Sequence, residues 1–141
     1  MRFVLRFLVL LLGLVSTATA LSIMIVGPLA VFAWVSVKLG LDVMGLEAFS
    51  QPFVDGTLRF AAFFYLVFGL VTMNVARDYR DNRQLIPVLM IILIIAGFAR
   101  LWSIYSLGDA GTLSLIAALT EILPATLILM LYFMTRGQDR Y

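Results

Sequence analysis

The stretch Leu85–Tyr105, LIPVLMIILIIAGFARLWSIY, decides the fold of this chain. It carries a single charged residue, Arg100, close to its far end. About twenty residues of α-helix rise roughly 30 Å, which matches the thickness of the hydrocarbon core of a bilayer. Pro87 falls in the first turn, where its missing N–H is harmless. The stretch is therefore predicted to be a transmembrane helix.

The composition of the 141-residue chain extends this interpretation to the whole molecule. Hydrophobic residues make up 63% of the chain and charged residues only 13%, whereas a soluble domain has about 25% charged residues. The mean hydropathy is +1.08. Because so much apolar surface cannot be covered by polar groups in water, we expect one all-α transmembrane domain over residues 1–141, with the lipid bilayer as its surroundings.

Three further apolar runs predict three more spans, which makes a four-helix transmembrane bundle. The expected spans are about 7–35, 57–76, 85–105 and 112–135, with a loop over 38–56 on the far side. The first run is longer than a bilayer requires, and we expect Gly27-Pro28 to bend it near the far interface. The loop over 38–56 is compatible with a short helix on the membrane surface or with an irregular loop.

The N-terminal segment also has features of a secretory signal. Arg2 and Arg6 precede an apolar run, and Ala18-Thr19-Ala20 has the residue types of a cleavage site. The apolar core of a signal is short and is followed by more polar residues, whereas Leu21–Ile25 continues as apolar as the residues before it. We therefore expect the segment to remain as the first span.

Positive charge is distributed unevenly between the two ends of the predicted bundle. With four spans, both termini and the turn over 77–83 share one side. The arginines of that side are Arg2, Arg6, Arg77, Arg80, Arg83, Arg136 and Arg140. The opposite loops carry Lys38 among acidic residues, so the positive-inside rule predicts that both termini are cytoplasmic. The turn itself resembles a phosphate or lipid-headgroup patch, although alternating charges are more typical of a solvated connector.

Two charged residues lie deep in the apolar runs, Arg100 in the third and Glu121 in the fourth. A charge in lipid costs several kcal/mol, so such residues face the bundle interior and find partners. Side chains lean toward the N-terminus of their own helix, and these two helices run in opposite directions. The two charged groups therefore converge at one depth, and we expect a charge-assisted pair with bidentate geometry open to it.

Small residues accompany both charges. Ala117 and Ala125 lie four residues on either side of Glu121, and Ala96 and Gly97 lie four and three residues before Arg100. Small residues on one face of a helix let a neighbouring helix approach closely. The charged face is therefore expected to be the packing face as well.

A proline and a further arginine complete the candidate site. Pro124 removes the usual helical partner of the Thr120 carbonyl and is expected to kink the fourth span. Arg59, near the start of the second span, either reaches the surface or adds a second positive partner. Arg59, Arg100, Thr120 and Glu121 are thus candidates for a polar pocket that holds a ligand or a proton. The competing interpretation is an ion pair that only fixes how the helices register.

The chain has no histidine and no cysteine. We therefore assign no catalytic residues, no metal ligands and no cofactor, and a net charge of +2 gives no reason to expect nucleic acid as a partner. The favoured function is a non-catalytic protein that binds a small molecule or lipid, or an accessory subunit of a partner membrane protein. The alternatives are a proton-coupled transporter that uses Glu121 and acts as a homo-oligomer, and a membrane-embedded lipid isomerase.

Several of these residues form a pattern along the last three spans. Its members are Arg59, Gly69, the stretch Gly97–Arg100 followed by Leu101 and Ser103, and Glu121. In this respect Thr57–Met134 resembles the DUF4345 family of small four-span bacterial membrane proteins, with Ala61-Ala62 where that family often has paired glycines. The resemblance implies a multi-pass protein of the bacterial cytoplasmic (inner) membrane. It implies no particular activity, because the function of the family is not known.

Overall fold

The computed structural model describes residues 2–41, 49–107 and 112–136 of the chain. The regular structure within these ranges is helical, as predicted. The elements are α1 (Arg2–Val26), α2 (Pro28–Leu39), α3 (Pro52–Arg77), α4 (Tyr79–Asn82), the 3-10 turn η2 (Arg83–Leu85), α5 (Ile86–Leu107) and α6 (Thr112–Arg136). Four segments, built on α1, α3, α5 and α6, are long and apolar enough to cross a bilayer. The chain is therefore a multi-pass, all-α membrane protein.

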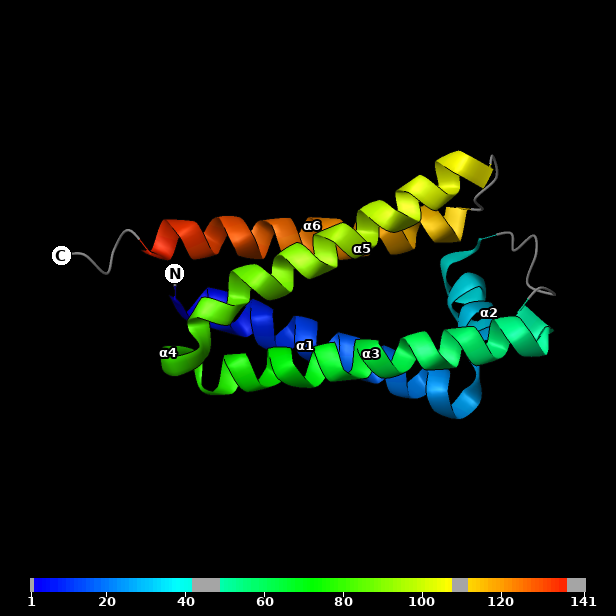
Figure 1. The fold of residues 1–141 in the computed structure, drawn as a ribbon, viewed down its shortest axis with the longest axis horizontal. Helices are drawn as coiled ribbons and strands as arrows, with labels where there is room; N and C mark the ends of the chain where they lie inside the picture. Colours follow the sequence, from blue (N-terminus) through cyan, green and yellow to red (C-terminus); the bar gives the residue numbers. More distant parts are fainter. Residues whose placement is uncertain (1, 42–48, 108–111, 137–141) are drawn as a thin grey trace.

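The first predicted span, 7–35, is divided into two helices. The expected bend at Gly27-Pro28 is a helix boundary, because α1 ends before it and α2 begins at Pro28. Gly27 has a φ of 99°, which L side chains rarely adopt, and Pro28 occupies the first turn of α2. Helix α2 turns away from α1 at the end of the molecule opposite the first residues of α1 (Figure 1).

The other helices follow the predicted spans more closely. Helix α3 begins at Pro52 rather than at residue 57, whereas α5 and α6 begin and end within two residues of the predicted limits. Helix α6 continues past Pro124 to its end, so this proline does not interrupt the helix. The surface helix considered for 38–56 depends largely on residues 42–48, and the turn before α6 on 108–111, which are outside the described residues.

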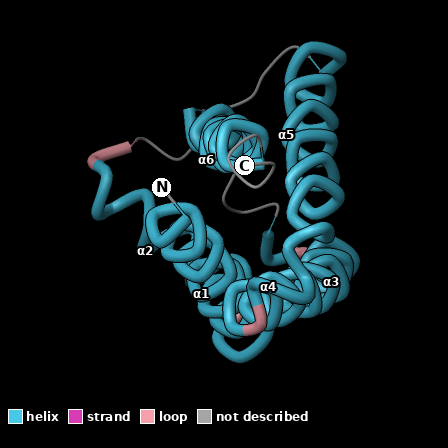
Figure 2. The backbone as a smooth tube through the Cα atoms, turned by 90° about the vertical axis from the view of Figure 1, so that its left-hand side faces the viewer, coloured by secondary structure: helices cyan, strands magenta, loops and turns pink. Residues whose placement is uncertain are grey.

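The long helices form two antiparallel pairs, α1 with α3 and α5 with α6 (Figures 1 and 2). Glycines permit the close approach within each pair. A Cβ added to Gly69 would lie 2.9 Å from the carbonyl oxygen of Gly13, and one added to Gly13 would lie 2.9 Å from that of Gly69. In the second pair, a Cβ on Gly97 would lie 3.1 Å from the carbonyl oxygen of Ala118.

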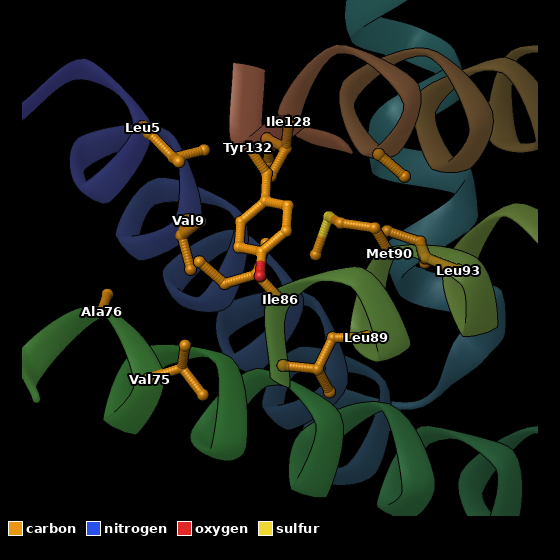
Figure 3. Close-up of a cluster of buried hydrophobic side chains, with 11 residues drawn as sticks. Leu5, Val9, Val75, Ala76, Ile86, Leu89, Met90, Leu93, Ile128 and Tyr132 are labelled. Atoms are coloured by element: carbon orange, nitrogen blue, oxygen red, sulfur yellow. The ribbon is translucent and has the colours of Figure 1, made fainter. Parts of the chain in front are cut away.

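A shared apolar core joins the two pairs near the end where α1 begins and α6 finishes. Figure 3 shows side chains from all four long helices pointing toward one another, with the Tyr132 ring among them. The cluster contains Leu5, Val9, Val75, Ala76, Ile86, Leu89, Met90, Leu93, Ala125, Ile128 and Tyr132. Toward the opposite end, α5 leans away from α1 and α3 (Figure 1). The helices therefore share one core at the first end and separate into two pairs toward the second.

Candidate functional site

Arg100 of α5 and Glu121 of α6 form the ion pair that helix direction and depth predicted. The Arg100 Nε lies 3.0 Å from both Oε1 and Oε2 of the Glu121 carboxylate. The Glu121 side chain is only 6% exposed, whereas that of Arg100 is 52% exposed. The acid is thus enclosed by the helix pair, and the guanidinium lies at the edge.

The geometry of this pair leaves part of the guanidinium available. One N–H group serves both carboxylate oxygens, so the pair does not use the two-nitrogen fork of a bidentate contact. Within the described part of the chain, the terminal nitrogens Nη1 and Nη2 of Arg100 make no hydrogen bond or ion pair. These N–H groups can donate to an anion while Nε keeps its hold on Glu121.

Small side chains bring α5 and α6 close enough for the pair to form. Gly97, one turn before Arg100, is buried as expected, and Ala125 is fully buried. Ala96, which was expected on the same face, is exposed. The third small residue of this contact is Ala118, which is fully buried, and not the predicted Ala117, which is half-buried. The rotation of α6 that turns Glu121 inward therefore places Ala118 beneath it, three residues earlier.

A hydroxyl group of the other helix pair lies near the ion pair. Tyr65 of α3 is within electrostatic range of both Glu121 and Arg100. Its hydroxyl approaches Ser16 of α1 without reaching full hydrogen-bond geometry, so Ser16 Oγ is buried with no partner among the described residues. The sequence analysis did not assign either residue to the site. The one distinguishing feature of Tyr65 in the sequence is its hydroxyl, in a run whose other rings are phenylalanines, Phe60–Phe68.

Arg59 lies with different partners, so of the two expectations for this residue, the second positive partner for Glu121 is wrong. Its Nε donates to Asp55 Oδ2 at 2.7 Å, one turn earlier on α3, and its Nη1 donates to the carbonyl oxygen of Met24 in the last turn of α1. That carbonyl lacks its usual helical partner because Pro28, four residues later, has no N–H. A Cβ added to Gly27 would lie only 2.8 Å from the Arg59 Nη2, so the guanidinium packs closely against this glycine. Arg59 therefore ties the end of α1 to α3.

Thr120 is adjacent to Glu121 in the sequence, but its side chain faces a different direction. The Thr120 side chain is exposed, and its hydroxyl donates to the carbonyl oxygen of Ala117 at 2.8 Å. The Thr120 carbonyl loses its helical donor to Pro124, and no side chain in the described ranges donates to it. The structure thus brings together two of the four candidates, Arg100 and Glu121.

Four apolar helices, with an ion pair between the last two, define a multi-pass membrane protein with a polar site inside its helical bundle. Within that class the chain belongs to the DUF4345 family, described as a domain of unknown function, whose model matches residues 4–132. The match includes α1, which lies outside the stretch that carried the resemblance. No curated protein and no solved structure matches the chain.

Proposed function

We propose that this protein is a non-catalytic membrane protein that binds the anionic group of a small molecule or lipid through Arg100. The supporting observation is that Nε and the two terminal nitrogens of the Arg100 guanidinium have different surroundings. Its Nε is held by the buried Glu121 carboxylate, while Nη1 and Nη2 remain on a half-exposed side chain. Glu121 thereby orients the donors, and a planar pair of N–H groups suits a phosphate or carboxylate.

The position of Arg100 along α5 supports a ligand that reaches it from the membrane interface. Trp102 and Tyr105 follow it on the same helix, and both side chains are largely exposed. Aromatic residues of this kind mark the level of the lipid headgroups. Arg100 is two residues, or about 3 Å, deeper than Trp102 along the helix axis, so an interfacial anion can reach its terminal nitrogens.

The membrane and the orientation are part of the same proposal. We place the protein in a bacterial inner membrane with both termini in the cytoplasm, because the positive-inside rule assigns the arginine-rich end to that side. Arg100 then opens toward the periplasmic leaflet. Reporter fusions after residue 141 should be active for a cytoplasmic fluorescent protein and inactive for a phosphatase that needs export; the reverse pattern would refute the orientation.

The binding proposal can be tested with variants that separate Arg100 from Glu121. Dodecyl phosphate, an anion with one alkyl chain, should raise the Tm of the purified protein in a neutral detergent. Glu121→Gln retains Arg100 and should retain most of this rise. The double variant Arg100→Met/Glu121→Gln removes both charges without leaving one buried alone, and should lose the part of the rise that Arg100 provides. Equal rises in the wild type and the double variant would show that Arg100 does not bind the anion.

A proton-coupled transporter is a second candidate, supported by the hydroxyl near the buried acid. Tyr65 is within electrostatic range of the buried Glu121 carboxylate and beside Ser16, whose Oγ is buried with no partner among the described residues, and intramembrane acids are often proton carriers. Four spans are few for a transport path, so this function needs a homo-oligomer. Crosslinking in native membranes that yields only monomers, or proton flux in liposomes unchanged by Glu121→Gln, would exclude it.

A further inference from the structure

Arginines that are far apart in the sequence gather at the end of the bundle where α1 begins. This end also carries the short helix α4 (Figure 1). The arginines come from the start of α1, the end of α3, and the connection between α3 and α5. Together they line one hollow of about 860 Å³: Arg2, Arg6, Arg77, Arg80 and Arg83. From the sequence alone the turn over 77–83 resembled a phosphate or lipid-headgroup patch, with a solvated connector as the more typical interpretation. The structure adds the cationic start of α1, which packs against this turn.

The lining of this hollow is strongly positive. Five arginines face two acidic residues, Asp78 and Asp81. Arg77 and Arg80 are exposed, and no salt bridge within the described ranges engages either of them. Like charges at close range repel one another, so such a concave surface is stabilised when an anion binds.

One of the five arginines fixes the base of the hollow. The Arg6 Nε donates to the carbonyl oxygen of Ala76 at 2.8 Å, and its Nη2 donates to that of Arg77 at 3.1 Å. These carbonyls belong to the last turn of α3, where helical partners are missing. These hydrogen bonds hold the start of α1 against the end of α3, so the residues at the base of the hollow are fixed relative to each other.

The hollow lies at the ends of spans, which is the level of lipid headgroups. Phe3 lines it as well, and this ring is 80% exposed, which suits contact with acyl chains. Arg80 and Arg83 also line a neighbouring hollow of about 230 Å³ with Gln84 and Thr135. Those polar side chains can hydrogen-bond the uncharged part of a headgroup.

We propose that this arginine-lined hollow binds the phosphate of an anionic membrane lipid. The site is separate from Arg100, which lies toward the other end of α5, and does not depend on the function proposed above. The position at the membrane interface and the exposed Phe3 ring favour a lipid over a phosphate compound from water.

The test uses the full-length protein in detergent with equal amounts of phosphatidylglycerol and phosphatidylcholine. Native mass spectrometry then counts the lipids that each variant retains. The wild type should retain phosphatidylglycerol preferentially. Arg77→Gln/Arg80→Gln should weaken that retention about thirtyfold. Each basic residue near an anionic headgroup strengthens binding by a factor of about five to six, and the two factors multiply. Lys38→Gln, an exposed cation on α2, is the matched control and should behave like the wild type.

Three results would overturn the proposal. The first is equal retention of phosphatidylglycerol by the wild type and Arg77→Gln/Arg80→Gln. The second is no preference between the two lipids. The third is displacement of the lipid by glycerol phosphate at the same concentration, which would assign the hollow to a soluble phosphate compound. Arg100→Met/Glu121→Gln should keep the arginine-dependent retention, so the two sites can fail independently.

Discussion

The α1–α3 pair and the α5–α6 pair each have glycine contacts and, toward the end away from the shared core, an arginine that joins the two helices, Arg59 in the first pair and Arg100 in the second. These two arginines bind different partners. In the first pair, Arg59 donates to a carbonyl of α1 and to an acid on its own helix. In the second pair, Arg100 donates directly to an acid on the opposite helix. Arg59 replaces the missing backbone donor to the Met24 carbonyl, and Arg100 neutralises the buried Glu121 carboxylate.

Exposure and the use of the guanidinium separate the roles of the two arginines. The Asp55 side chain is 32% exposed and that of Glu121 only 6%, so Asp55 can be hydrated without its partner and Glu121 cannot. Arg59 uses Nε and Nη1 in hydrogen bonds and packs Nη2 against Gly27. Arg100 keeps both terminal nitrogens available. Arg59 therefore has a structural role, whereas Arg100 also has the donor groups that the proposed binding function requires.

Arg100→Ala is expected to have the largest effect on stability. It leaves the Glu121 carboxylate enclosed without a cation, and breaking a buried pair in this way costs roughly 3–5 kcal/mol. Because the Arg100 side chain is 52% exposed, we expect a loss of about 3 kcal/mol, at the lower end of that range. Reversible unfolding in mixed micelles measures the free energy.

The matched control for this variant is Arg100→Ala/Glu121→Gln. Removing the second charge should restore more than half of the lost stability, since no ion is then left buried. A double variant no more stable than Arg100→Ala would show that the loss comes from the packing of the arginine stem and not from the unpaired acid.

Alanine substitutions at the glycine contacts should have the next largest effects on stability, and the two losses should be unequal. A Cβ on Gly69 would lie 2.8 Å from the backbone nitrogen of Thr17, so Gly69→Ala forces α1 and α3 apart, at about 2 kcal/mol. For Gly97 the nearest atom is Ile122 Cγ1, at 2.5 Å. That side chain can rotate, so Gly97→Ala should cost about 1 kcal/mol. A larger loss for Gly97→Ala in the same unfolding assay would reverse the ranking.

Arg59→Ala should lower the free energy of unfolding by about 1 kcal/mol, because exposed ion pairs contribute little and one carbonyl also loses its donor. The effect should be local. Hydrogen exchange should accelerate around the boundary between α1 and α2 and remain unchanged in α5 and α6. Uniform acceleration of exchange in all four long helices would show that the Arg59 contacts stabilise the whole bundle and not only this boundary.

Asp55→Asn is the smallest change in the series. The Asp55–Arg59 pair lies within one helix, at a spacing of four residues, and the side chains are 32% and 40% exposed. We expect a change below about 0.5 kcal/mol. A loss as large as that of Arg100→Ala would remove the distinction drawn between the two arginines.

Hydropathy and helix direction were sufficient to predict the spans and the Arg100–Glu121 pair, because both depend on depth along a helix. The partner of Arg59 depended on where α3 begins. Reading residues 38–56 as a loop left Asp55 outside the helix, whereas the start at Pro52 puts it one turn before Arg59. A shift of one turn at a helix end therefore decided which acid the arginine met.

Features that depend on helix rotation or on packing between distant segments were not predictable in the same way. The aromatic run that contains Tyr65 surrounds α3, so its pattern does not show which ring turns inward. The basic hollow requires Arg6 to lie against the end of α3, a contact between residues 70 positions apart. A contact over so many positions cannot be predicted from a local pattern in the sequence.

The short separation between Arg100 and Glu121 bears on how the chain enters the membrane during synthesis. The two residues are 21 positions apart on consecutive helices. If α5 left the translocation channel alone, it would carry an arginine into lipid at an apparent cost of about 3 kcal/mol. Release of α5 and α6 together lets each charge meet the other before either faces acyl chains. The ion pair therefore favours integration of this hairpin as a single unit, after α1 and α3 are already in place.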